Sequence, residues 1–137
     1  MIDYLLDSNV IVRFLTQDDP RQGKAAAKLF LSAKRGDSAL HLESSIVAEV
    51  VYVLESSYYG KPRMQIADSL ADLLKNPGIE AESYEAIVDA LNRFRDHPAV
   101  DYADCWLAAL AAHRGMPVAS FDRDFDRFGD IKRWEPS

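Results

Sequence analysis

Short apolar segments alternate with longer helical segments along the whole chain, and this alternation limits the folds that the chain can adopt. The short segments have the length of buried strands and lie at 4–6, 39–42, 79–81, 118–120 and 131–134. Apolar residues between them recur at helical spacing, which predicts helices over 10–16, 20–35, 44–54, 64–74, 84–94 and 101–113. Strands that alternate with helices form a parallel sheet covered by helices on both faces. We therefore expect an α/β fold with a central parallel sheet.

The size and composition of the chain indicate one globular domain, residues 1–137, without repeats or linkers. Hydrophobic residues make up 48% and charged residues 28% of the chain, as in ordinary soluble proteins. No apolar stretch reaches membrane-spanning length, and the N-terminus lacks the pattern of a signal peptide. The single cysteine, Cys105, cannot form an internal disulfide and lies in an apolar stretch. We expect it to be a core residue of a cytoplasmic protein.

The net charge of −6 argues against nucleic-acid binding through a basic surface alone. It does not exclude a nucleic-acid enzyme, because carboxylates that hold divalent cations are neutralised in the working site. Seven basic residues could contact phosphates, although solubility explains them equally well: Arg13, Lys24, Lys28, Arg93, Arg95, Arg123 and Arg127.

Acidic side chains follow the predicted strands or lie near the starts of predicted helices. Asp7 follows the first strand and Asp122 follows the strand at 118–120. Glu49 lies about one turn into a helix, on the flank of its apolar stripe. Asp104 lies at the start of an alanine-rich helix that we expect to be buried nearly all round. Because ligands bind at the carboxyl ends of parallel strands, these acids are candidates for one site.

Each of these acids also has a simpler explanation. Asp7 could cap a helix, and Glu49 could be a solvated helix charge. Asp101 and Asp104 have the spacing of a capping box, and capping accounts for Asp101 well. Asp122 could belong to the polar run 122–127. No single acid is specific, but the four together at one predicted edge are harder to explain in this way.

Converging carboxylates repel one another unless a cation binds between them. Hard oxygen ligands suit Mg²⁺ or Mn²⁺, whereas Cys105 and the three histidines have no zinc-ligand spacing and are expected to be structural or exposed. Paired hard cations can activate water and stabilise the leaving oxygen in phosphodiester cleavage.

The ordered set of motifs resembles the PIN domain family over nearly the whole chain, and is most similar to VapC-type toxins of toxin–antitoxin pairs. The motifs are Leu6-Asp7-Ser8-Asn9, the helical Glu49, Val100-Asp101-Tyr102-Ala103-Asp104, and Ser120-Phe121-Asp122-Arg123-Asp124-Phe125. The resemblance implies a three-layer α/β/α sandwich whose central parallel sheet has about five strands. It also implies an Mg²⁺- or Mn²⁺-dependent ribonuclease, a homodimer, and a small antitoxin that blocks the site.

The resemblance also assigns roles to residues. Asp7 would be the central metal ligand, and Glu49 and Asp104 would complete the first metal site. Asp122 would hold a second metal or orient the attacking water. Two polar residues would support these ligands: Asn9, two positions after Asp7, and Ser120, through a hydrogen bond to a carboxylate. Asp101 and Asp126 are weaker further candidates.

Three other protein classes share part of this pattern. A haloacid-dehalogenase-type phosphatase needs a second aspartate two residues after Asp7, where this chain has Asn9. A receiver domain needs an aspartate after a central strand, where this chain has Ser44 and Ser45. A PIN-like scaffold that only binds remains the main alternative, although it has no need for four mutually repelling carboxylates. For the homodimer, we expect apolar faces on the helices around 25–30 and 64–74 to be incompletely covered.

Overall fold

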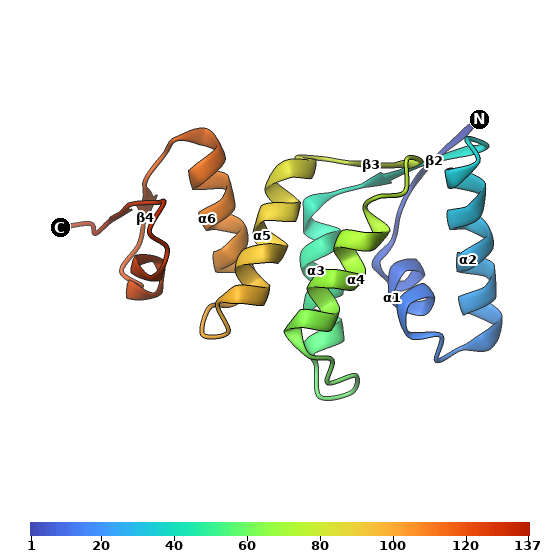
Figure 1. Cartoon of the computed structure of the whole chain (residues 1–137), viewed down its shortest axis with the longest axis horizontal. Coiled ribbons are helices and arrows are strands. Elements are labelled where there is room, and N and C mark those ends of the chain that lie inside the picture. Colours follow the sequence, from blue (N-terminus) through green and yellow to red (C-terminus); the bar gives the residue numbers. More distant parts are fainter. The chain divides into compact units, whose positions relative to one another are not determined.

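The structure is a computed structural model that describes all 137 residues. The chain forms two compact units, residues 1–84 and 85–137, which are described in turn (Figure 1). None of the helices combines the length and the apolar composition that a membrane span requires.

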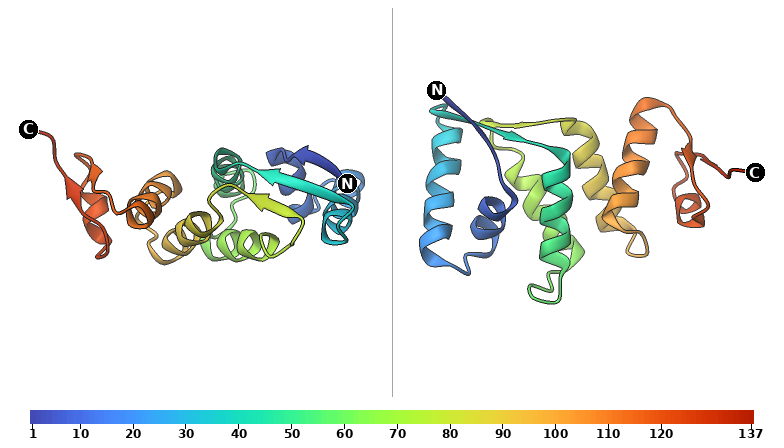
Figure 2. Two further views of the ribbon diagram at one scale, coloured as in Figure 1. Left: turned by 90° about the horizontal axis from the view of Figure 1, so that it is seen from above. Right: turned by 180° about the vertical axis from the view of Figure 1, so that it is seen from behind.

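The first unit is a three-stranded parallel sheet with four helices. Its strands run in the order β1-β2-β3, with Asp3 opposite Ala39 and Leu40 opposite Ile79, and lie side by side in Figure 2. The helix α1 packs against α2 and α3, and α3 packs against α4. The elements are β1 (Ile2–Leu5), α1 (Ser8–Thr16), α2 (Pro20–Lys34), β2 (Ser38–Leu42), α3 (Ser44–Glu55), α4 (Arg63–Leu73) and β3 (Ile79–Ala81).

Apolar side chains at strand and helix spacing form the core of the first unit. Leu40, Val50, Val51, Ile66 and Leu70 are almost completely buried. This packing covers much of the apolar faces of α2 and α4 but not all of them, in agreement with the expectation that they are incompletely covered. The exceptions are Leu31 and Met64, whose exposed fractions are 45% and 65%.

Gly78 allows α2 to lie directly against the turn that precedes β3. A Cβ atom on Gly78 would lie 2.1 Å from the carbonyl oxygen of Ala33, closer than atoms can approach. The Gly78 carbonyl also accepts the N–H of Leu40 at 2.8 Å, and its N–H donates to the Asn76 side chain at 2.9 Å. Only glycine fits at this position without moving the backbone.

The second unit contains two helices, a short parallel strand pair and a 3₁₀ helix. Phe94, Val100, Cys105, Phe125 and Phe128 are buried in it. The buried state of Cys105 confirms it as a core residue. The elements are α5 (Tyr84–Asp96), α6 (Tyr102–Arg114), β4 (Val118–Ala119), the 3₁₀ helix η1 (Arg123–Arg127) and β5 (Arg133–Trp134).

A buried arginine ties α5 to the loop before β5. Arg93 donates to Asp89 at 3.1 Å and to Asp130 at 2.9 Å. Its guanidinium carbon lies 5.1 Å from the centre of the Phe128 ring. These partners compensate the cost of burying a charge, so we assign Arg93 a structural role.

All the predicted helices and strands are present, but the expected single sheet of about five strands is wrong in detail. The five strands form a three-stranded sheet, β1-β2-β3, and a separate two-stranded sheet, β4-β5. The strands β4 and β5 are only two residues long and pair in parallel with each other, with Val118 opposite Arg133. The helix α6 is also less buried than expected: Ala103 is exposed and Leu107 has an exposed fraction of 43%. Its buried residues occupy one side, the side of Cys105 and Ala108.

Candidate active site

Asp7 lies directly after β1, at the residue that precedes the first turn of α1. The Leu6 N–H donates to the His41 carbonyl at 2.9 Å, so parallel pairing continues to the residue before Asp7. Asp7 occupies the N-cap position, but its side chain makes no capping hydrogen bond and is exposed. The capping explanation therefore does not account for the carboxylate, which stays open to a ligand.

Glu49 lies on α3 beside the buried Val50 and is itself exposed. This exposure fits the flank position and the simpler explanation of a solvated helix charge equally well. Its carboxylate makes no ion pair or hydrogen bond within the chain. Like Asp7, it belongs to the first unit and is free to bind a ligand.

Asp104 lies in the first turn of α6 and is half-buried. Burial raises the pKa of its carboxyl above the ordinary value, and the negative charges of Asp122, Asp101 and Asp124 raise it further. The structure therefore brings Asp104 and Asp122 into each other's electrostatic field within the second unit. Such crowding favours a bound cation, because a cation relieves the repulsion between the carboxylates.

Asp122 precedes η1 and has a structural role besides its candidate one. Its Oδ1 accepts the N–H of Asp124 at 2.8 Å, which caps the 3₁₀ helix. A carboxylate has about four acceptor positions, so this single bond leaves most of them available. The structural and the functional explanation of Asp122 are therefore compatible.

The two residues proposed to support the ligands, Asn9 and Ser120, have different surroundings. Asn9 is exposed and lines a surface cavity of about 390 Å³ together with Gln22 and Leu29. Ser120 was expected to bond a carboxylate. Its Oγ instead accepts the backbone N–H of Asp122 at 2.9 Å. A serine hydroxyl commonly accepts the N–H two residues further along the chain, and this local bond forms here in place of the expected one.

The two weaker candidates differ from each other. Asp101 occupies the N-cap of α6 without a side-chain capping bond, so capping does not account for it as expected. Its charge instead contributes to the raised pKa of Asp104. Asp126 is engaged with Arg133 at 3.1 Å, and this hydrogen bond lowers the pKa of Asp126. Of the two, Asp101 is the one with a carboxylate open to a ligand.

A pair of acids at the carboxyl edge of the first sheet was missed by the sequence analysis. Glu43 follows β2 and Glu82 follows β3. A hydrogen bond between their carboxyl groups raises the pKa of Glu43, and Ser44 Oγ donates to Glu82 at 3.4 Å. The rule that singled out Asp7 and Asp122, an acid directly after a strand, also applies to these two residues.

The donor chemistry of the candidate acids fits a divalent metal ion, although a closed metal site is not formed within either unit. No group of three or more acidic, histidine or cysteine side chains lies close enough together to enclose an ion. Carboxylate oxygens are nevertheless the hard ligands that Mg²⁺ and Mn²⁺ prefer, and they are supplied here by Asp7, Glu49, Asp104 and Asp122.

Most of the seven basic residues that could contact phosphates, and all three histidines, have partners within the chain. Arg13 pairs with Asp18 at 2.9 Å, and Arg127 with Asp124 at 3.2 Å. Arg95 pairs with Asp96. Hydrogen-bonded or charged partners also hold the histidines: His41 bonds Asp3, His97 bonds the Arg93 carbonyl, and His113 pairs with Asp89. The expectation that the histidines are structural or exposed is thus confirmed.

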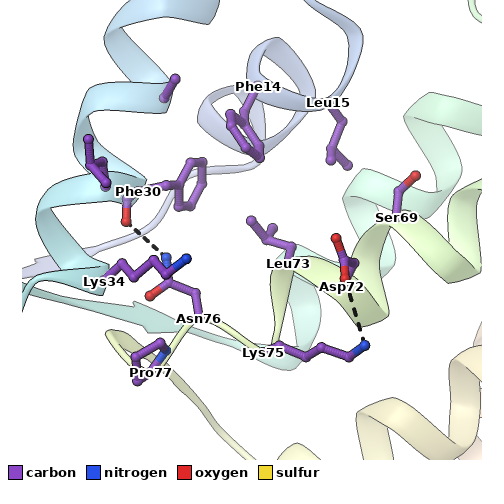
Figure 3. A pocket seen from close by; sticks show the side chains of 12 residues that line it. Phe14, Leu15, Phe30, Lys34, Ser69, Asp72, Leu73, Lys75, Asn76 and Pro77 are labelled. Carbon is purple, nitrogen blue, oxygen red and sulfur yellow. Dashed lines mark hydrogen bonds and ion pairs between the residues drawn. The ribbon is translucent and has the colours of Figure 1, made fainter.

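A cavity of about 540 Å³ lies in the first unit among α1, α2 and α4 (Figure 3). Phe14, Phe30 and Leu73 supply an apolar wall, and Lys34 and Lys75 lie at its margin. None of the candidate acids lines this cavity. This cavity is therefore not part of the candidate site.

Comparison with known protein families gives a match that covers most of the chain. The PIN domain family matches residues 4–131, a span that contains Asp7, Glu49, Asp104 and Asp122. The chain belongs to the PIN domain family. PIN domains are generally nucleases that use divalent metal ions. The open carboxylates of this PIN domain are consistent with that chemistry.

No curated protein matches this PIN domain. Among solved structures, it is similar to VapBC2 from Rickettsia felis, crystallised with a DNA fragment from their promoter. The sequence identity is 17%, both chains are covered over 100% of their length, and the TM-score is 0.39. A backbone similarity at this level assigns no residue and no partner.

Proposed function

We propose that this PIN domain is an Mg²⁺- or Mn²⁺-dependent endoribonuclease whose site residues are Asp7, Glu49, Asp104 and Asp122. The observation that carries the proposal is the family match over residues 4–131, which contains all four acids. The negative charge of Asp122, which contributes to the raised pKa of Asp104, supports it. The match also runs through both compact units, so we infer that residues 1–137 act as one PIN domain.

In this proposal Asp7, Glu49 and Asp104 hold a divalent cation, and Asp122 holds a second cation or orients the attacking water. A bound cation would supply Lewis-acid chemistry, in which water is activated and the leaving oxygen of the phosphodiester is stabilised. Ser120 positions Asp122 through its backbone N–H. Asn9 supports the ligands from the residue two places after Asp7.

A nuclease assay with and without a chelator tests the enzyme against its alternative, a PIN-like scaffold that only binds. The pure protein should cleave RNA in Mn²⁺ or Mg²⁺ and lose this activity in EDTA. Asp7→Asn and Asp104→Asn should each abolish cleavage while the protein stays folded, because each removes a ligand charge with little change in volume. Cleavage at the wild-type rate by folded Asp7→Asn protein would overturn the site assignment.

We further propose that the chain is the toxin of a VapBC-type pair and acts in the cytoplasm. The active site of a toxin must be silenced in its own cell, and a negative site is most simply blocked by a cation. We infer that a small antitoxin places an arginine or lysine near Asp7 and Asp104. Co-expression with the neighbouring upstream gene product, followed by pull-down, tests this. Growth arrest that no neighbouring gene relieves would contradict the toxin proposal but not the nuclease.

We also propose that the chain forms a homodimer. The faces of α2 and α4 are mostly buried, but Leu31 and Met64 are exposed. A two-fold contact that covers them would bring two copies together. Light scattering at tens of micromolar should give twice the mass of one chain, and a monomer there would contradict the dimer.

A further inference from the structure

Phe121 is an exposed apolar ring on a fixed stretch of backbone. Its exposed fraction is 72%, whereas Phe94, Phe125 and Phe128 of the same unit are buried. The Ser120 N–H donates to the Trp134 carbonyl at 3.0 Å, and Arg133 donates to the Ser120 carbonyl at 3.1 Å. These bonds hold the residue before Phe121 against β5.

The residue after Phe121 is held as firmly. The Asp122 N–H donates to Ser120 Oγ at 2.9 Å, and Asp122 Oδ1 accepts the Asp124 N–H at 2.8 Å. Both neighbours of Phe121 are therefore fixed by hydrogen bonds. The ring is presented to solvent by an ordered turn, so its exposure is a property of the fold rather than of a mobile loop.

The basic residues near Phe121 in the sequence differ in whether they have partners. Arg127 is paired with Asp124 and Arg133 with Asp126. Arg123 has no hydrogen bond or ion pair, and only its charge acts on Asp126. Three consecutive residues thus present an exposed aromatic ring, a candidate catalytic carboxylate and an unpaired guanidinium.

We propose that Phe121 is a positioning residue that stacks on an unpaired nucleobase of the RNA while Arg123 contacts a neighbouring phosphate. This inference rests on the ribonuclease function proposed above and names what holds the strand beside Asp122. Stacking of bases on aromatic side chains is a common way of binding single strands, and it requires a base that is free of a duplex. Phosphate contacts of arginine set the register of the strand.

A protein partner fits the surroundings of Phe121 less well than a nucleobase does. The fully buried centre of a protein interface is depleted of charged residues. Phe121 is followed by Asp122, Arg123 and Asp124, whose charges a protein partner would have to desolvate. A nucleobase stacked on one face of the ring leaves these charges in contact with water, phosphate or cations.

Binding of a short fluorescent RNA to the full chain tests the proposal without cleavage. A single strand of about 10 nucleotides, within the usual site size for such proteins, is titrated in EDTA over a series of salt concentrations. Phe121→Leu should weaken binding about tenfold, and Phe121→Tyr should restore it. The slope of log Kd against log salt should stay unchanged in Phe121→Leu. It should fall by roughly 0.7 in Arg123→Gln, because one phosphate contact is lost.

Tyr58→Leu is the matched control, because Tyr58 is exposed to a similar extent, 80%, and is not adjacent to a candidate acid. It should leave RNA binding unchanged. In Mn²⁺, Phe121→Leu should lower kcat/KM for single-stranded RNA by a similar tenfold factor, and Phe121→Tyr should rescue it. Melting by circular dichroism should show the variants to be folded, as expected for exposed positions.

The outcomes separate this inference from the function on which it rests. If the wild type cleaves RNA and Phe121→Leu binds and cleaves it equally well, stacking on Phe121 is wrong and the nuclease stands. An equal loss of binding in Tyr58→Leu would likewise overturn a specific role for Phe121. If the wild type neither binds nor cleaves RNA, both proposals fail. Equal binding of duplex and single-stranded RNA would also contradict stacking on an unpaired base.

Discussion

Ser120 Oγ accepts the backbone N–H of Asp122 at 2.9 Å, so the serine fixes the backbone that carries the carboxylate rather than the carboxylate itself. Asp122 in turn accepts the N–H of Asp124 through Oδ1. These two successive hydrogen bonds among Ser120, Asp122 and Asp124 fix the turn after β4. A defect at Ser120 should therefore be transmitted to Asp122 through the backbone.

Ser120→Ala should lower stability modestly and cleavage more strongly. Loss of one hydrogen bond costs about 0.5–1.5 kcal/mol, measurable by urea unfolding. Cleavage should fall because Asp122 is less well positioned. Ser120→Thr keeps the hydroxyl and should retain both properties. Full activity in the alanine variant would show that the hydrogen bond does not position Asp122.

Gly78→Ala should destabilise the first unit and leave the candidate site residues untouched. The new methyl group would lie 2.1 Å from the Ala33 carbonyl oxygen, so α2 or the turn must move. Overpacking of this kind typically costs about 1–3 kcal/mol. Gly129→Ala is the matched control, since a Cβ there meets nothing within 4 Å. Urea denaturation that gives equal midpoints for the two variants would contradict the close approach.

The secondary structure could be predicted from the sequence because local signals mark its boundaries. Pro20 begins α2, where Asp19 caps the helix through the Gln22 N–H at 3.0 Å. Gly115 ends α6 with a positive φ of 63°. Strand pairing could not be predicted, because it depends on partners distant in the sequence. The division of five strands into sheets of three and two is therefore known only from the structure.

The identities of the candidate acids could be predicted, but their hydrogen bonds could not. Asp7 and Asp101 have the spacing of caps, yet neither side chain makes a capping bond. Sequence spacing determines which backbone N–H groups lie near a side chain, but it does not determine the side-chain torsion angles on which a capping bond depends. Glu43 and Glu82 were missed because their carboxyl groups come together only when β2 and β3 are paired.

Asp18→Asn should destabilise the protein at neutral pH and much less in acid. Hydrogen bonds from Tyr59 and then Thr16, together with Arg13, hold the pKa of Asp18 well below its ordinary value of 3.8. A lowered pKa in the folded state stabilises the protein above pH 3.8, and this stabilisation is lost as the pH falls towards the folded pKa. Unfolding midpoints of wild type and variant should therefore converge as the pH falls below 4.

Asp19→Asn is the control for this pH series. Asp19 caps α2, and asparagine caps equally well, so the variant should follow the wild type at every pH. A constant difference between wild type and Asp18→Asn from pH 7 to pH 3 would show that ionisation of Asp18 does not contribute.

In metal-free protein, Asp104→Asn should affect stability at neutral pH in the opposite direction to Asp18→Asn. Burial and then Asp122 raise the pKa of Asp104 above the ordinary value of 3.8, so the folded state holds this proton more tightly than the unfolded state. Wild-type stability should therefore fall as the pH rises from 3.8 through the folded pKa. At neutral pH in EDTA, Asp104→Asn should be at least as stable as the wild type.

Asp126→Asn, in the same unit, should change stability in the opposite direction to Asp104→Asn. The hydrogen bond from Arg133 lowers the pKa of Asp126, so this carboxylate stabilises the folded state at neutral pH. Its replacement should lower the melting temperature at pH 7. If Asp104→Asn and Asp126→Asn were destabilised alike in EDTA, the repulsion between Asp104 and Asp122 would be absent.

The most direct test of the central claim is scanning calorimetry of wild type, Asp7→Asn and Asp3→Asn, each in EDTA and in Mn²⁺. An ion that binds only the folded state stabilises it by about 2.7 kcal/mol at one hundred times its Kd. This should raise the melting temperature of the wild type by several degrees, at roughly 2–8 °C per kcal/mol. Asp3→Asn should show the same shift, because Asp3 pairs with His41 and is not a proposed ligand. Asp7→Asn should show a much smaller shift and be no less stable in EDTA. Equal shifts in wild type and Asp7→Asn would mean that Asp7 holds no metal ion, and would contradict the proposed active site.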